Sequence, residues 1–304
     1  MEKYNILVVL FSISLFSCDN NFVLLEQEVS IPCDVSCKDG NMTYLNNACK
    51  GDGFFYLNYC DHFFQISEDL TDVKLLADCN GWMRDNDEML VRNDSLLISS
   101  VIDNGDLTYL YEYYDHVSAK WTIIYSFDRL EVEHRFEKQF EDEVYNIYFS
   151  NREEGIGYLL FEEKKSGVEH VFKVYQFVKL LCFQGSYYII GRRSIEKITN
   201  SFSQVDNIYS TPEDVSIISG LIIDNDIYIL ANNSIETYIA KLDVSRLVKI
   251  KDFGNQLHFS NYSRFNLGYS TRQDQIFLPY YQDVSGKSGF VDINKYKIRI
   301  INLE

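Results

Sequence analysis

The chain has 304 residues, of which 46% are hydrophobic and 15% aromatic, and its formal net charge is −17. Only 3 prolines and 15 glycines are present, which excludes collagen-like and Pro/Gly-rich disordered chains. The negative charge repels nucleic acid and anionic membrane surfaces; it attracts a basic protein partner or serves solubility alone.

The first residues are typical of an export signal. The apolar run from Ile6 to Phe16 has signal-peptide length and is too short to span a bilayer. Leu15-Phe16-Ser17-Cys18 resembles a bacterial lipobox. The resemblance implies cleavage before Cys18, lipidation of its thiol, and anchoring to a bacterial envelope membrane, facing the periplasm or the outside. An ordinary secretory signal is the alternative, and four Asn-x-Ser/Thr sequons leave a eukaryotic secreted origin open.

Six cysteines remain if Cys18 is lipidated, and an even number in an exported chain predicts disulfides. The disulfide candidates are Cys33, Cys37, Cys49, Cys60, Cys79 and Cys182. If all six pair, one of the first five must pair with Cys182; the connectivity itself stays open. The spacings match no zinc ribbon or finger, and no C-x-x-C is present.

From Gly53 onward, short apolar runs alternate with polar turns. In the stretch Gly220–Asp243, the turns Asp224–Asp226 and Asn232–Ser234 separate three runs, because Asp and Asn tolerate left-handed backbone and bond their own backbone. Similar runs fall into about six groups of roughly 40 residues, the repeat length of four-stranded propeller blades. The charged segment Glu131–Phe140 is predicted to form either a helix or an outer strand and hairpin.

We therefore predict an all-β fold, a β-propeller of about six blades, with tandem β-sandwiches as the alternative. The expected domains are a signal peptide (1–17), a lipid tether and Cys-rich entry segment (18–50), and a propeller-like domain (51–304). Val144–Phe149 followed by Gly155–Tyr158 is similar to the strand-turn-strand of sialidase-like and photosystem-assembly-like propellers, and Asp115–Trp121 is loosely like an Asp-box. Both resemblances imply the same fold.

Motifs for catalysis are absent from the sequence. A sialidase needs three arginines around a carboxylate, but no Arg-Ile-Pro segment occurs. The five histidines have no metal-site spacing, and nucleophile-elbow, P-loop and dinucleotide glycine patterns are missing. Asp-rich turns such as 103–106 suit tight hairpins better than Ca²⁺ loops. We expect no enzyme activity, no cofactor and no metal.

The acidic segment Glu131–Glu143 is either a solvated face or a docking patch for a basic protein, with nearby Tyr and Phe as interface anchors. Its candidate partner-binding residues are Glu131, Glu133, Glu137, Glu141, Asp142 and Glu143.

One further resemblance concerns function. Asp61–Phe64 followed by Asp78–Trp82 resembles lipoprotein immunity proteins of bacterial type VI secretion. This implies an envelope lipoprotein that binds and neutralises a toxic effector. A glycan-binding or glycan-processing propeller and an envelope-assembly scaffold are the alternatives.

Overall fold

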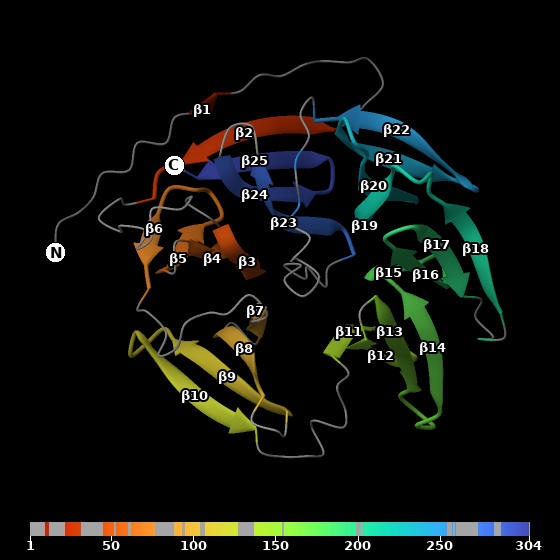
Figure 1. Cartoon of the computed structure of the whole chain (residues 1–304), viewed down its shortest axis with the longest axis horizontal. Coiled ribbons are helices and arrows are strands. Elements are labelled where there is room, and N and C mark those ends of the chain that lie inside the picture. Colours follow the sequence, from red (N-terminus) through yellow and green to blue (C-terminus); the bar gives the residue numbers. More distant parts are fainter. Residues whose placement is uncertain are drawn as a thin grey trace. The chain divides into compact units, whose positions relative to one another are not determined.

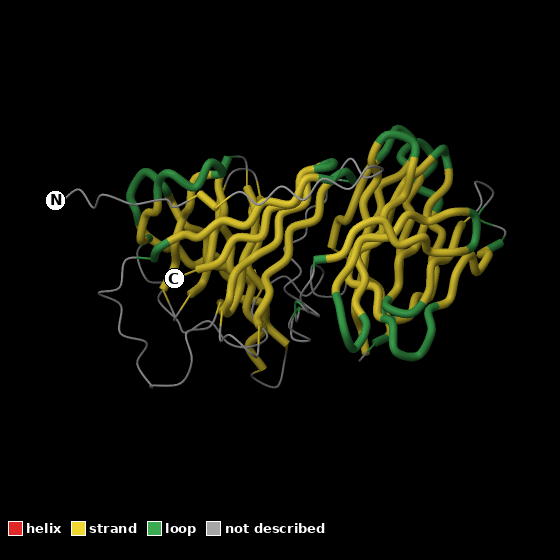
Figure 2. The backbone as a smooth tube through the Cα atoms, turned by 90° about the horizontal axis from the view of Figure 1, so that it is seen from above, coloured by secondary structure: helices red, strands yellow, loops and turns green. Residues whose placement is uncertain are grey.

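The computed structural model describes residues 10–11, 22–31, 45–51, 53–59, 62–76, 88–92, 95–103, 107–126, 137–153, 155–198, 202, 204–253, 257, 259, 273–282 and 287–303. Within this part, every regular element is a strand, and Figure 2 shows the described residues as strands and loops. The chain divides into two compact units. Unit 1 comprises residues 1–132, 258–270 and 277–304, and unit 2 comprises residues 133–257 and 271–276.

Unit 1 contains three sheets, labelled by strand in Figure 1. Sheet S1 consists of β3 (Leu45–Gly51), β4 (Phe54–Tyr59), β5 (His62–Ser67) and β6 (Val73–Leu75). Sheet S2 consists of β7 (Glu88–Arg92), β8 (Ser95–Asp103), β9 (Leu107–Asp115) and β10 (Lys120–Ser126). Sheet S6 has the order β1 (Leu10–Phe11), β2 (Val23–Val29), β25 (Lys297–Leu303), β24 (Lys287–Asn294) and β23 (Gln275–Gln282), the first two residues of β23 falling in unit 2.

Unit 2 contains the other three sheets, each made of four consecutive antiparallel strands. Sheet S3 consists of β11 (Glu137–Glu141), β12 (Tyr145–Glu153), β13 (Ile156–Glu163) and β14 (Glu169–Tyr175). Sheet S4 consists of β15 (Phe177–Phe183), β16 (Ser186–Gly191), β17 (Ser194–Ile198) and β18 (Val205–Ser210). Sheet S5 consists of β19 (Ser216–Ile223), β20 (Asp226–Asn232), β21 (Thr237–Asp243) and β22 (Arg246–Asp252).

These six sheets are the blades of a β-propeller, as predicted from the spacing of the apolar runs. Sheet S5 shows why the sequence folds this way. Asp224 takes a left-handed conformation, with φ of 53°, in the β19–β20 turn, and the Asn233 side chain accepts hydrogen bonds from the backbone N–H groups of Ile235 (2.8 Å) and Glu236 (2.9 Å). Both turns therefore form through the predicted Asp and Asn chemistry.

Sheet S6 joins the two ends of the described chain. β2 pairs in parallel with β25, with Val23 opposite Lys297 and Val29 opposite Leu303. The segment 18–50, expected to be a tether and entry segment, thus contributes β2 to sheet S6 and β3 to sheet S1. Polar residues in β2 hid it from the sequence pattern, since a strand that is mostly half-buried or exposed tolerates them.

Apolar side chains fill the space between neighbouring sheets within each unit. In unit 1, Phe55 of S1 stacks on Phe277 of S6, with ring centroids 5.4 Å apart, and Phe290 lies 4.8 Å from Phe55. In unit 2, Leu181 and Ile190 of S4 pack with Ile217 and Ile229 of S5. Each side chain of these clusters leaves water on folding, which stabilises the unit by about 1.5–3 kcal/mol for a large aliphatic or aromatic group.

A buried ionic network lies beside the aromatic cluster of unit 1. Asp292 has no exposed surface and accepts hydrogen bonds from Arg299 (Nε, 3.0 Å) and Lys50 (Nζ, 3.2 and 3.3 Å). Glu68 also binds the Lys50 ammonium group at 2.8 Å. Lys50 and Arg299 both lie over the ring of Phe55, at 5.1 and 5.2 Å from its centroid. The network therefore ties S1 to S6 with two cations and two carboxylates.

The structure also decides one open alternative and adds one strand that was not expected. The segment that reads as helix or strand forms a strand over Glu137–Glu141, paired with β12. β18 was not anticipated; all residues of this outer strand are exposed or half-buried, and half of its sequence VDNIYS is polar.

Candidate protein-binding face

An acidic row crosses one end of sheet S3. The strand registers place Glu141 opposite Asn146, Asn146 opposite Glu162, and Glu162 opposite Glu169. Directly opposed residues project to the same face of a sheet, so three glutamates from three strands lie in line. We call this set (Glu141, Asn146, Glu162, Glu169) the acidic row.

Aromatic and apolar side chains continue the same face along the strands. At the positions two residues along each strand from the acidic row, Tyr148 lies opposite Leu160, and Leu160 lies opposite Val171. Beyond them lie Tyr158 opposite Lys173 and Ile156 opposite Tyr175. Val171 is 56% exposed and Tyr175 59% exposed, so the outermost strand, β14, presents the uncovered part of this face.

The electrostatics of the acidic row are unfavourable without a partner. Like charges directly opposite on neighbouring strands destabilise a sheet by up to about 1 kcal/mol, and Glu162 faces Glu169 in this way. The Glu162 carboxylate accepts hydrogen bonds from Tyr148 Oη (3.3 Å) and Asn146 Nδ2 (3.4 Å). Glu141 pairs with Lys164 at 3.2 Å. The tyrosine hydroxyl thus joins the acidic row to the aromatic part of the face.

The opposite face of S3 is fixed by an aromatic cluster shared with S4. Phe202 lies within 5.0 Å of Phe161 and 4.9 Å of Tyr145, measured between ring centroids, and stacks on His170 at 4.4 Å. Tyr187 of β16 extends the cluster and donates a hydrogen bond to Asp142. Burial, and then this bond, raises the pKa of Tyr187. The sheet is therefore a rigid support for its other face.

The predicted acidic segment divides accordingly. Glu141 and Glu143 are exposed, as a docking patch requires. Asp142 instead holds the β11–β12 turn, since its carboxylate accepts hydrogen bonds from the backbone N–H groups of Val144 and Tyr145, both at 2.8 Å. For Glu137 the structure describes the backbone alone, and Glu131 and Glu133 lie outside the described residues.

Sequence reasoning missed the two other glutamates of the acidic row. Glu162 and Glu169 flank the polar stretch Lys164–Val168. Treating that stretch as a hairpin turn would have placed the two glutamates opposite each other.

No disulfide is seen among the residues that the structure describes. Cys49 and Cys182 carry free thiols, and burial raises the pKa of both. Because Cys182 is free, the pairing of all six candidates does not occur in this structure. Cys18, Cys33, Cys37, Cys60 and Cys79 lie outside the described residues, so lipidation of Cys18 and pairing among the others stay predictions.

Residues that carried the family resemblances have structural roles where they are described. Phe63 and Phe64 are fully buried in unit 1. Asp115 accepts hydrogen bonds from Val117 N (2.9 Å) and Ser118 Oγ (2.7 Å) in the β9–β10 turn; the Ser118 bond is the main cause of its lowered pKa. Trp121 packs against Phe63, with ring centroids 5.0 Å apart.

No group of three or more His, Cys, Asp or Glu side chains within the described ranges is placed to hold a metal ion. Arg193 donates to the backbone carbonyls of Glu213 (2.5 Å) and Val215 (2.9 Å), which fixes the entry to β19. A membrane-spanning helix is likewise not found in the described segments.

Comparison with known proteins identifies no family. Neither a protein-family model nor a curated protein matches the chain. Among solved structures it is similar to an oligogalacturonate lyase in complex with manganese (10% identity, TM-score 0.39, covering 83% of this chain and 74% of the lyase). It is also similar to YjhT (8%, TM-score 0.41, 86% and 98%) and to the tricorn protease (14%, TM-score 0.46, 85% and 26%). At these identities the likenesses assign no activity.

Proposed function

We propose that this chain is a non-enzymatic binding protein, and that the face of S3 formed by the acidic row and Tyr148, Tyr158, Val171 and Tyr175 binds a basic protein. One observation carries the proposal: three glutamates of separate strands align beside exposed aromatic and aliphatic side chains. Such a face combines the anchors that dominate interface energies with charges that speed and orient association.

The cellular setting belongs to the same proposal. Lipidation of Cys18 anchors the protein to a bacterial envelope membrane, where its partner arrives from the periplasm or from outside. The finer proposal is that this partner is a secreted toxic effector, which the chain neutralises by covering it. Co-expression with a toxin encoded by a neighbouring gene tests this point, since protection of the cell must then depend on the same face.

The experiment compares capture by the protein and by two charge-reversed variants. The test variant is Glu141→Lys/Glu169→Lys, which reverses two exposed charges of the acidic row. The control, Glu213→Lys/Asp214→Lys, reverses two exposed charges in the loop before β19 of sheet S5. Proteins captured from envelope extract are identified by mass spectrometry, and binding of the purified candidate is then measured at several salt concentrations.

We expect a basic partner that binds the protein and the control equally and the test variant at least tenfold more weakly. Its association rate should fall as salt rises, because rim charges act mainly on association. A second variant, Tyr175→Ala, should weaken binding about 30-fold or more if Tyr175 is an anchor, since anchors contribute about 2 kcal/mol or more. Equal binding by all variants would show that this face of S3 does not bind the partner.

A further inference from the structure

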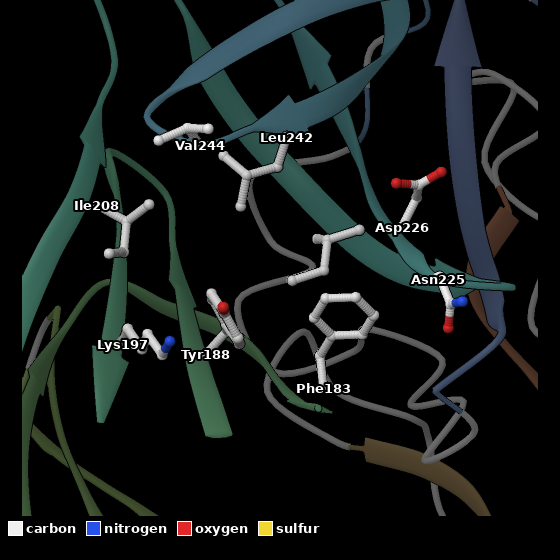
Figure 3. Close-up of a pocket in the computed structure, with 9 residues that line it drawn as sticks. Phe183, Tyr188, Lys197, Ile208, Asn225, Asp226, Leu242 and Val244 are labelled. Carbon is white, nitrogen blue, oxygen red and sulfur yellow. The ribbon is translucent and has the colours of Figure 1, made fainter. Parts of the chain in front are cut away.

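A pocket of about 250 Å³ lies at one end of unit 2, on a different pair of sheets from the protein-binding face. Its walls come from S4 and S5, at the end where the β15–β16, β19–β20 and β21–β22 turns gather. Figure 3 shows the residues that line it. The exposed side chains of Asn225 and Val244 mark its opening to solvent.

The walls combine apolar with polar side chains. Phe183 and Tyr188 stand edge to face, with ring centroids 6.2 Å apart and planes at 62°. Leu242 of S5 lies above these rings in Figure 3, and Ile208 lines the pocket from β18. Ile227 of β20 also lines it. Apolar walls with a few placed polar groups are the usual composition of small-molecule sites.

The two charged side chains of the pocket, Lys197 and Asp226, differ in whether they form an ion pair with the described residues. Lys197 forms no ion pair with any carboxylate of the described residues; its ammonium group lies 5.5 Å from the ring centroid of Tyr188. Asp206 is opposite Lys197 on β18, but its carboxylate accepts a hydrogen bond from Gln204 instead. Asp226 is neutralised by Lys241 at 2.7 Å. In this acidic chain, whose net charge is −17, the pocket therefore holds a cation that no carboxylate of the described residues pairs with.

The polar groups also lie apart. In Figure 3, Lys197 is on one side of the pocket and Asn225 and Asp226 are on the other, with the rings of Phe183 and Tyr188 between them. A ligand that fits this arrangement has an anionic group at one end, an apolar or aromatic body, and a hydrogen-bonding group at the other end.

We propose that this pocket binds a small amphipathic carboxylate, with the carboxylate on Lys197, the apolar body against Phe183, Tyr188 and Leu242, and a hydroxyl or amino group at Asn225 and Asp226. A charge-assisted hydrogen bond from Lys197 fixes the orientation, because such bonds are about twice as strong as neutral ones. The pocket has no role in the protein-binding proposal, so either proposal can fail without the other.

The test uses 4-hydroxyphenylacetate as the probe, observed by ligand-detected NMR titration with the full chain. A ligand of this size should bind with a dissociation constant on the order of a few millimolar or tighter. The uncharged 4-hydroxyphenylacetamide has the same ring and hydroxyl and should bind at least tenfold more weakly. Equal affinity of the two probes, or no saturable binding of the carboxylate, overturns the proposal.

Two variants localise the binding. Lys197→Met removes the charge while keeping an unbranched chain, and it should weaken the carboxylate at least tenfold while leaving the amide unchanged. Lys165→Met removes an exposed lysine of the β13–β14 turn and should change neither. Leu242→Trp fills the pocket with Lys197 intact and should abolish binding of both probes. Full binding by a folded Leu242→Trp protein, checked by circular dichroism, refutes this location.

Discussion

The substitution Asp292→Asn tests whether the ionic network between S1 and S6 stabilises unit 1. The Asp292 carboxylate is fully buried and receives hydrogen bonds from both Lys50 and Arg299. Asparagine keeps the size but not the charge, which leaves two cations facing the single carboxylate of Glu68, itself 40% exposed. Removing one partner of a buried ion pair costs about 3–5 kcal/mol, and a domain's whole stability is about 5–15 kcal/mol.

Urea unfolding followed by tryptophan fluorescence measures this loss, because Trp121 is buried in the core of unit 1. The control is Glu28→Gln, which breaks the partly exposed Glu28–Lys287 pair (3.4 Å) of the same sheet. That change should cost less than about 1 kcal/mol. If Asp292→Asn lowers the free energy of unfolding no more than Glu28→Gln does, the network contributes packing and not charge, and the reasoning is refuted.

Two further predictions concern unit 2. Burial lowers the pKa of Lys179 to about 7, so between about pH 7 and pH 10 the unfolded chain binds more protons than the folded one and stability rises with pH. Lys179→Met should remove up to about 1 kcal/mol per pH unit of that rise, measured by urea unfolding of the protein and the variant at pH 7.5 and pH 9. An equal change in the free energy of unfolding between the two pH values in both proteins would contradict the prediction. Val244, which is 85% exposed, has a φ of 57°, a left-handed conformation that a β-branched side chain disfavours. Val244→Asn should raise the thermal midpoint, because the free energy of unfolding should increase by about 1 kcal/mol. An unchanged or lower midpoint would show that the turn is unstrained.

Much of the fold was predictable because most strands carry their own signal. The apolar run in β13 and the polar turn at Asp224 could be read directly from the sequence. β18 and β2 could not, since their residues are mostly half-buried or exposed and so need no apolar pattern. The pairing of β2 with β25 joins residues from opposite ends of the chain, and no local pattern encodes such a pairing.

The candidate sites differ in the same way. The acidic segment was visible as a run of charges, and its exposed members Glu141 and Glu143 were found from it. The full acidic row depends on strand register, which places Glu162 and Glu169 beside Glu141. The pocket around Lys197 draws on six strands and two turns, so its residues share no motif.

The parallel pairing of β2 with β25 sets an order on assembly. β2 can pair with β25 only after residue 297 has been synthesised, because Val23 lies opposite Lys297. Unit 2, by contrast, is built almost entirely from the continuous stretch 133–257. Closing so long a loop carries a large entropic cost and slows folding. The stretch 133–257 of unit 2 can thus fold while β2 still lacks its partner strand β25. During this interval the unpaired edge of β2 makes the nascent protein most prone to mispairing with another chain.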